Sequence, residues 1–458
     1  MDRFFLTEQK LKKIIGGAGL VAISIGLALS LLFLPPYITF FLVIGVAWLA
    51  LIFRWPFLGL IGYLLVVLLR PSEVYGIPYV AKAAAGSCLL VLLAHIVQQR
   101  KFPTVNSAYK AMLFFSAAVA LSVMTAFWLQ PVLYIWQNTL KLLVLYTLII
   151  AFASTERRLG ALGVVVLVAI GYAGSHVIYQ LITGSAGSDQ RIYDLAWGMF
   201  GDSNEFAQVV TMVIPILVLL LMESKGIIWR VFYTAMIGIN MTIFILGKSR
   251  GGFLGMLVVV VALIYSSSRR FMLLAILILV LGIAFLSAPS AYFERLGSIA
   301  DYAQDESATG RLDAWKAGIR MFLRNPVTGI GAGCFEFASP DYGLSAGMVA
   351  HNSFVTALAE TGLIGFSAFI LIMVYTFRAC SRIDTNLKRL GRQKGLLYIL
   401  ARGLPISMIG YIVTGIFIST IFYPHLYILS AMASAGEIMT DRWVTEKSAA
   451  PAEANVSG

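Results

Sequence analysis

The sequence predicts an all-α polytopic membrane protein with about 12–14 transmembrane helices. Hydrophobic residues make up 59% of its 458 residues and charged residues 12%, whereas soluble domains contain roughly 45–50% apolar and about 25% charged residues. Apolar runs long enough to cross a bilayer, which takes about 20 residues, recur along the chain. Lys and Arg gather in alternate loops between these runs, as the positive-inside rule expects.

Fourteen apolar segments are candidate spans. They are 14–34, 37–53, 56–69, 79–98, 109–128, 132–152, 160–182, 203–222, 226–246, 251–265, 270–288, 351–378, 396–419 and 421–439. The pair 37–53 and 56–69 is short enough to form a hairpin, and 251–265 is short enough for a partial span, so the number can fall to twelve. The first segment is too long for a signal-peptide core and lacks a small-residue cleavage site, which predicts an uncleaved span.

The loop charges predict cytoplasmic N- and C-termini. The basic loops alternate along the chain and contain Arg54, Arg100, Lys101, Arg157, Arg158, Lys225, Arg269, Arg270 and the run 378–394. On the opposite, periplasmic side only the loops 183–202 and 289–350 are long. This divides the chain into an N-terminal bundle (1–288), a periplasmic loop (289–350), C-terminal transmembrane helices (351–440) and a small, polar, disordered cytoplasmic tail (441–458).

Several classes of function are excluded by composition. The net charge of +12 lies in short loops, which fits membrane topology and gives no reason to expect nucleic acid as a partner. The three cysteines, Cys88, Cys334 and Cys380, form neither a disulfide framework nor a zinc motif. The segment "GIGAGC" at 329–334 lacks the strand and acidic residue of a dinucleotide site, so we expect a flexible glycine turn and no cofactor.

The periplasmic loop contains a predicted amphipathic helix at about 310–324. Thr309 is its expected N-cap, and Pro326 marks its end. Apolar Leu312, Trp315, Ile319 and Phe322 recur at helical spacing, and Lys316, Arg320 and Arg324 form a second stripe. Such a helix is suited to lie on a membrane surface beside anionic head groups.

Four cations are predicted to face the periplasm: Arg191, Lys248, Arg250 and Arg311. Guanidinium groups match phosphate or pyrophosphate oxygens bidentately, so converging arginines indicate such a ligand. The alternative is that these side chains snorkel to the interface. For Arg250 we favour ligand binding because "GKSRGGFLG" is a short, glycine-rich turn between two spans; for Arg191 and Arg311 both interpretations stay open.

Two further polar residues are ambiguous. Lys141 lies in the middle of a predicted span, where it needs a ligand or a structural ion pair. In "GDSNEFA", Asp202 or Ser203 is expected to cap the following helix. Glu205 has two possible partners there, a substrate hydroxyl or an arginine.

His351 is the best-placed acid–base residue. It stands at the predicted start of a helix, whose dipole opposes protonation and favours a neutral imidazole. A neutral imidazole can serve as a general base. The alternative role is an interfacial cap. Glu360 is about 13 Å further along the helix at 1.5 Å per residue, so it cannot orient His351 directly.

Four segments together resemble the bacterial O-antigen ligase/polymerase family. They are "DQRIYDLAWGMFGDSNEFA", "GKSRGGFLG", "TGRLDAWKAGIRMFLRNPVTGIGAGCFEF" and "AHNSFVTALAETGLIGF". The resemblance covers roughly residues 185–370, and within the family the chain is most similar to the O-glycosylation ligases found beside exosortase systems.

This resemblance implies an integral inner-membrane glycosyltransferase with a C-type multi-span fold. Such enzymes move a glycan from undecaprenyl diphosphate to a hydroxyl at the periplasmic face, without metal or nucleotide. Ligases use the lipid A core as acceptor, and polymerases extend another lipid-linked chain. The family's essential arginines correspond to Arg191 and Arg250, and its histidine to His351. Arg311 matches the arginine that precedes the family's tryptophan, here Trp315.

We therefore expect the arginines to hold the donor pyrophosphate while His351 takes the proton of the acceptor hydroxyl. Trp315, Lys248, Lys141 and Asn352 are expected to contact the substrates. Three alternatives stay open. They are a polymerase of the same family, a transporter of lipid-linked glycans, which would show internal repeats that we do not find, and a structural member of a wall-assembly complex.

Overall fold

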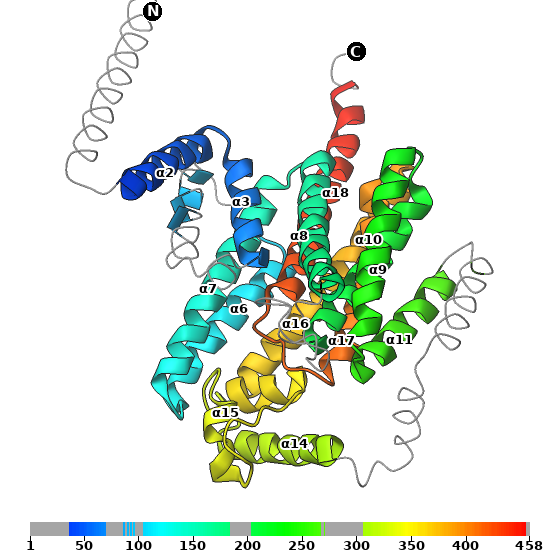
Figure 1. Cartoon of the computed structure of the whole chain (residues 1–458). Coiled ribbons are helices and arrows are strands. Elements are labelled where there is room, and N and C mark those ends of the chain that lie inside the picture. The colour runs from blue at the N-terminus through cyan, green and yellow to red at the C-terminus, as the bar shows by residue number, and fades with distance from the viewer. Residues whose placement is uncertain are drawn as a thin grey trace, which may run out of the picture. The chain divides into compact units, whose positions relative to one another are not determined.

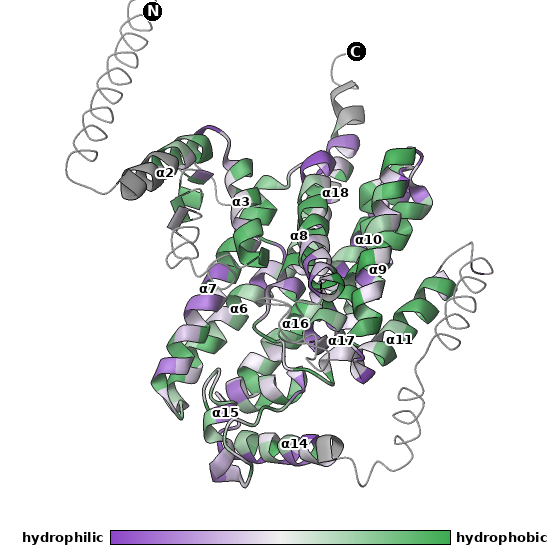
Figure 2. Cartoon of the chain, in the orientation of Figure 1, coloured by the Kyte–Doolittle hydropathy of each residue, from purple (hydrophilic) through white to green (hydrophobic). Residues whose placement is uncertain are grey.

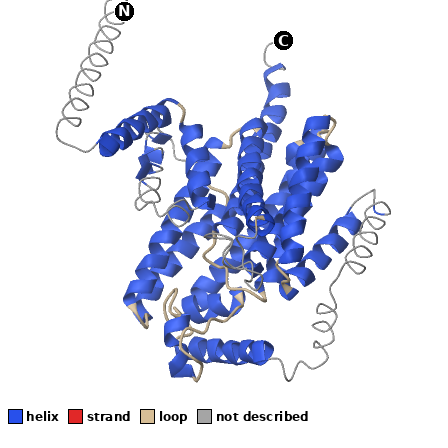
Figure 3. Cartoon of the chain, viewed as in Figure 1, coloured by secondary structure: helices blue, strands red, loops and turns tan. Residues whose placement is uncertain are grey.

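All elements in the described part of the computed structural model are helices (Figure 3). That part comprises residues 36–69, 86–87, 89–90, 92–93, 95–96, 104–183, 203–266, 270 and 306–454. The predicted all-α class is confirmed. The predicted spans 14–34 and 270–288 (apart from residue 270), most of 79–98, and Arg191 lie outside the described residues.

The chain divides into two compact units, Met1–Gly59 and Leu60–Gly458. The described part of the first contains α2 (Pro36–Arg54), and α3 (Pro56–Leu69) includes the boundary. The remaining helices belong to the second unit. They are α6 (Ser107–Leu121), α7 (Leu129–Phe152), α8 (Glu156–Ile182), α9 (Ser203–Glu223), α10 (Ile227–Leu246), α11 (Arg250–Ser266), α14 (Glu306–Arg324), α15 (Phe335–Ala338), α16 (Ser353–Leu390), α17 (Leu396–Gly415) and α18 (Pro424–Ala454), with the 3₁₀ turns η1 (Ser122–Thr125) and η5 (Ser339–Tyr342).

Seven described segments are long and apolar enough to cross a membrane, judged by length and composition. They are 107–125, 129–152, 156–180, 203–223, 227–246, 353–390 and 396–415, and α3 and α11 are shorter apolar helices. Hydrophobic residues dominate these helices (Figure 2). The protein is therefore a multi-pass membrane protein.

Helix α9 packs against α10, α11 and α17, while α16 packs against α6, α17 and α18. Small residues allow the close approaches. A Cβ added at Gly255 of α11 would lie 2.3 Å from Cγ2 of Thr414 in α17. Glycine at such positions lets transmembrane helices approach at backbone distance. The core of the second unit is therefore built around α9, α16 and α17.

The two ends of this bundle are distinguished by the residues that lie there. At one end Glu437 accepts a hydrogen bond from Asn106 Nδ2 at 2.7 Å and pairs with Arg382 at 3.0 Å. Arg442 donates to the carbonyl of Ser154 at the same end. The basic segment 378–394 lies there too, at the turn between α16 and α17. The opposite end, where α9, α11, α16 and α18 begin, is called the site end below.

Two helix boundaries differ from the sequence predictions. Helix α14 begins at Glu306, so Thr309 lies inside it and is not its N-cap. No glycine or proline interrupts 306–309, and nothing there stops a helix. Helix α18 continues to Ala454, so most of the predicted disordered tail is helical. The alanines at 449, 450, 452 and 454 favour a helix, while Pro451 among them opposes it.

Helix α16 is broken near the site end. Gly362 has φ 61° and ψ −164°, and the helix resumes after it. The freed backbone groups bind the segment 326–331: Leu363 N–H donates to the Pro326 carbonyl at 2.8 Å, and Ile330 N–H donates to the Ala359 carbonyl at 2.9 Å. Irregular backbone at membrane depth requires such internal partners. The backbone groups freed by the break therefore bind the turn that follows α14.

The same turn is held by a buried carboxylate. Glu360 accepts hydrogen bonds from Gly333 N–H at 2.8 Å and Phe335 N–H at 3.1 Å. Gly329, Gly331 and Gly333 all have positive φ, and a Cβ at Gly329 would lie 2.3 Å from the Glu360 carbonyl carbon. The predicted glycine turn exists, but it is packed against α16 and is not a flexible linker.

Candidate functional site

His351 immediately precedes the N-cap of α16. Its φ is 46°, a left-handed conformation that is uncommon outside glycine but enriched in Asn, Asp and His. The cap itself is Asn352, whose Oδ1 accepts from the N–H groups of Phe354 at 2.9 Å and Val355 at 3.1 Å. The capping role that the sequence left open for His351 is therefore filled by Asn352. Asn352, which is expected from the sequence to contact substrate, thus uses its side-chain oxygen to cap α16.

Trp315 links α14 to the segment that leads into His351. Its indole N–H donates to the carbonyl of Ala350 at 3.0 Å. One turn further along α14, a Cβ at Gly318 would lie 2.4 Å from Cγ1 of Val355, so α14 rests directly on the first turn of α16. Trp315 thus contacts the neighbour of His351, and its only hydrogen-bond donor is occupied within the protein.

Replacing Trp315 by Phe should therefore weaken any activity that depends on His351. The variant loses one hydrogen bond, worth about 1 kcal/mol, and keeps most of the aromatic packing. We expect roughly a five-fold loss in turnover with normal accumulation in the membrane. Transfer assays on purified protein check this. Trp229→Phe, at the opposite end of the bundle, is the matched control, and equal activities of the two variants would contradict the prediction.

The turn "GKSR" carries two of the predicted cations. Lys248 has φ 48°, and Ser249 caps α11 by accepting from Gly252 N–H at 3.0 Å. The Ser249 hydroxyl also donates to Oδ1 of Asn204 at 2.6 Å, which ties this turn to the start of α9. Lys248 and Arg250 are both exposed at the site end, as the sequence predicted for residues at the membrane edge.

The α17–α18 segment, residues 416–423, joins this turn to the start of α16. A Cβ at Gly251 would lie 2.6 Å from Cβ of Phe417. Two residues on, Ser419 Oγ accepts from Asn352 N–H at 3.1 Å. The neighbours of Arg250 and of His351 therefore contact the same three-residue stretch. This stretch thus links the chain neighbours of two candidate residues that are about a hundred positions apart in sequence.

The same segment binds the first turns of α9. Tyr423 donates its hydroxyl to Glu205 Oε1 at 2.5 Å, and Thr420 donates to Gln208 Oε1 at 2.7 Å. Thr420 N–H also donates to Ser353 Oγ at 3.0 Å. Glu205, for which the sequence left a substrate hydroxyl or an arginine as partners, thus has Tyr423 as one partner. Hydrogen bonds thus hold α9, α16 and the 416–423 segment together at the site end.

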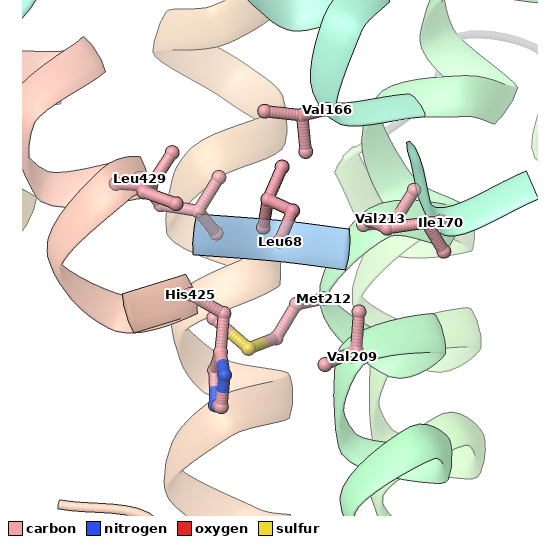
Figure 4. Close-up of a pocket in the computed structure, with 9 residues that line it drawn as sticks. Leu68, Val166, Ile170, Val209, Met212, Val213, His425 and Leu429 are labelled. Carbon is pink, nitrogen blue, oxygen red and sulfur yellow. The ribbon is translucent and has the colours of Figure 1, made fainter. Parts of the chain in front are cut away.

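Below this layer lies a buried polar pair. His425 Nε2 is 2.9 Å from Gln208 Oε1, and both side chains are buried. His425 also lines a cavity of about 20 Å³ whose other walls are aliphatic, including Val209, Met212 and Leu429 (Figure 4). A space of this size holds about one water molecule. It is too small for a sugar or a lipid chain, so it is not the substrate site.

The other predicted site residues are placed as follows. Arg311 lies on α14, half-buried. Lys141 lies in α7, where its Nζ donates to Asn138 Oδ1 at 2.9 Å. It is twelve residues into α7, about 18 Å from the start of that helix. The structure therefore places Lys141 well away from Arg250 and His351, with an amide partner in its own helix. Arg191 lies outside the described residues.

Sequence reasoning missed the residues that assemble the site. It assigned no role to three of them, which are Ser419, Thr420 and Tyr423. For Glu360 it predicted only that this residue cannot orient His351. A signal existed for one of them: a carboxylate inside an apolar segment must find partners, and Glu360 finds two backbone N–H groups. Within the described residues no group of three or more His, Cys, Asp or Glu side chains could hold a metal ion.

Cys334 lies in the glycine turn, and its thiol should be unreactive. Burial raises the pKa of this thiol to about 11, the neighbouring Glu360 carboxylate adds to the rise, and contacts with the Trp128 and Phe127 carbonyls oppose it. Since the folded-state pKa exceeds the ordinary value of about 8.5, the neutral thiol favours the fold at neutral pH, and this contribution falls as the pH rises from about 8.5 to 11.

Iodoacetamide at pH 8 should therefore leave Cys334 unmodified in the folded protein and modify it after denaturation. Mass spectrometry of the peptide containing Cys334 measures this directly. Alkylation in the folded protein at the rate of a free cysteine would contradict both its burial and its raised pKa.

Residues 234–370 match the family described as O-Antigen ligase. The chain is also similar to the exopolysaccharide production protein ExoQ of Rhizobium meliloti (strain 1021), with 30% identity over 86 residues. That alignment covers 17% of this chain and 20% of the ExoQ protein, so the match spans about a fifth of that relative's length. The family match includes Arg250, Arg311, Trp315 and His351.

Proposed function

Because residues 234–370 are O-antigen ligase-like, we propose that this membrane protein is a glycosyltransferase with a lipid-linked donor. It moves a glycan from undecaprenyl diphosphate to an acceptor hydroxyl at the periplasmic face of the bacterial inner membrane. The acceptor is the lipid A core or a related hydroxyl compound. Lys and Arg in segment 378–394, at the end opposite the site, support cytoplasmic termini and a periplasmic site end.

The observation that supports this proposal is that the chain neighbours of Arg250 and of His351 contact one short segment at the site end. Their neighbours Gly251 and Asn352 contact Phe417 and Ser419 of one short segment. A cation at a membrane boundary suits the pyrophosphate of a lipid-linked donor, because this group has two charged phosphates beside an apolar chain.

In the proposed reaction the acceptor oxygen attacks the anomeric carbon of the donor glycan. The bond from that carbon to the phosphate oxygen breaks, and undecaprenyl diphosphate leaves with the electron pair. Arg250, with Arg191, stabilises the charge on this leaving group. His351 takes the proton of the acceptor hydroxyl. Lys248 and Arg311 line the substrate path, Asn352 holds the first turn of the helix that follows His351, and Trp315 positions the segment before His351.

Lys141 has a weaker place in this scheme. The sequence allowed it to contact substrate from the bundle interior. Its bond to Asn138 and its distance along α7 favour a structural role. In the proposed scheme Lys141 is therefore a structural residue and does not contact the donor.

A second candidate function is polymerisation. The similarity to a protein named for exopolysaccharide production favours it. A polymerase would use the same residues but take another lipid-linked glycan as acceptor. The sequence alternative of a transporter would use the same site to bind the glycan without chemistry.

One experiment separates these functions. The purified full-length protein is reconstituted with a lipid-linked glycan and, in parallel, with and without a lipid A core acceptor. Glycan joined to the core indicates a ligase, and longer lipid-linked chains formed without the core indicate a polymerase. Recovery of unchanged donor in every reaction would contradict the proposed chemistry.

A further inference from the structure

Glu205 is a carboxylate at the site end to which the proposed reaction assigns no role. It lies in the first turn of α9 and is partly exposed. Gln208, three positions further and on the same side of the helix, is fully buried and binds Thr420 and His425. This side of α9 thus carries one polar residue for the interior of the bundle and another at its surface. A carboxylate at a membrane boundary needs polar partners.

Tyr423 is one partner and holds this carboxylate in place. Its hydroxyl donates to Glu205 Oε1 at 2.5 Å, and its side chain is partly exposed as well. Helices α9 and α17 lie side by side (Figure 1), which brings the segment 416–423 after α17 to the first turn of α9. A carboxylate offers about four acceptor positions, so the bond from Tyr423 does not exhaust it.

The surroundings of Glu205 connect it to both halves of the candidate site. The side chain of the residue before Glu205 accepts a hydrogen bond at 2.6 Å from Ser249, the residue before Arg250. Its partner Tyr423 lies in the segment that contacts the residue after His351. Glu205 is the one carboxylate in the four described stretches that contribute to this part of the site end, 203–208, 248–252, 350–356 and 416–423.

The negative charge of Glu205 decides which part of a lipid-linked donor it can bind. A carboxylate repels the donor phosphates, which suit the guanidinium group of Arg250. Sugar hydroxyls are neutral hydrogen-bond donors, and their bonds to a charged acceptor are about twice as strong as bonds between neutral groups. In glycoside cleavage, hydrogen bonds to the sugar strengthen in the transition state. Because the first sugar is bonded directly to the pyrophosphate, a carboxylate close to Arg250 is suited to bind that sugar.

We propose that Glu205 is a sugar-binding residue that accepts hydrogen bonds from hydroxyl groups of the first sugar of the donor glycan. Tyr423 is a positioning residue that orients the carboxylate. The site then has two parts of opposite charge, a cationic part for the pyrophosphate and an anionic part for the glycan. This division lets the protein distinguish the donor from the undecaprenyl diphosphate left after transfer, because only the donor carries the sugar. The assignment rests on the proposed function.

Binding measurements separate this role from a structural one and need no transfer reaction. The full-length protein in detergent is titrated with lipid-linked glycan and, separately, with undecaprenyl diphosphate that carries no sugar. Glu205→Gln keeps an oxygen that accepts from Tyr423 but removes the charge. We expect this variant to bind the glycan donor about ten-fold more weakly. Its affinity for undecaprenyl diphosphate should stay the same or increase, since a negative charge near the phosphates is removed.

Tyr423→Phe is the matched variant, since it loses the internal hydrogen bond and keeps the carboxylate. It should weaken binding of the glycan donor less than Glu205→Gln does. A structural role predicts the reverse order, because Gln restores the acceptor while Phe removes the donor. Glu223→Gln, at the other end of α9, should change neither affinity.

Three results would overturn the assignment: no weaker binding of the glycan donor by Glu205→Gln, an equal loss for both ligands, or a larger loss in Tyr423→Phe. Turnover measured in parallel keeps this test apart from the proposed function. If the unaltered protein binds the donor with the expected dependence on Glu205 but transfers no glycan, the proposed function fails and the sugar-binding role stands. If the unaltered protein does not bind the glycan donor, both fail.

Discussion

Replacement of His351 by Asn should abolish glycan transfer while the protein still inserts and accumulates normally. Asn tolerates the left-handed backbone observed at this position, so the variant removes the imidazole without straining the chain. The loss of a general base should lower turnover by about 10²–10⁴-fold. Initial rates of glycan transfer by reconstituted protein measure this effect, with His95→Asn, which contacts Phe152 at the opposite end, as control.

Arg250→Lys tests the other half of the site. Lysine retains the charge but not the planar fork that binds two phosphate oxygens. We expect a loss of at least about ten-fold in turnover for Lys and a larger loss for Ala. If both His351→Asn and Arg250→Ala transferred glycan at near-normal rates, the proposed assignment of base and pyrophosphate ligand would be untenable.

Replacement of Gly362 by Ala should be the most damaging change to the fold. The combination of positive φ and extended ψ at Gly362 is accessible almost only to glycine, and the new Cβ would lie 2.4 Å from the carbonyl carbon and oxygen of Val327. The strain and the clash together should cost about 4 kcal/mol. This is a large part of the 5–15 kcal/mol that typically stabilises a fold.

Gly343→Ala is the matched control. Gly343 also has positive φ, at 81°, but no atom lies within 4 Å of an added Cβ. It should cost only about 1 kcal/mol. Thermal unfolding in detergent compares the two, and equal midpoints would mean that the break in α16 does not depend on close contact with the turn after α14.

The spanning helices were predictable from the sequence because hydropathy acts locally. The apolar runs at 109–128, 132–152 and 203–222 largely coincide with helices α6, α7 and α9. The boundary errors have local causes as well. Thr309 is a good N-cap residue type, but no residue upstream of it stops the helix, which begins at Glu306. At the start of α16 the cap is Asn352, one of the strongest capping residue types, and not its neighbour His351.

The assembly of the site could not be predicted, because it depends on contacts between distant residues. Ser353 meets the 416–423 segment across 65 positions, and Thr420 meets Gln208 across 212. Hydropathy and helical periodicity carry no information about such pairs. They do not reveal the break at Gly362 either, since a glycine inside an apolar run is compatible with an uninterrupted helix. The pattern predicted which residue types face the site end, but not what holds them together.

The segment 416–423 and the start of α9 both lie outside the stretch that matches the family, which ends at residue 370. A chimera that exchanged only 234–370 with a relative would bring in a new arginine and histidine but keep the old Ser419, Thr420 and Tyr423 as their support. Such a chimera should lose its activity unless the supporting residues are exchanged as well. The residues that a working site needs therefore extend beyond the residues 234–370 that match the family.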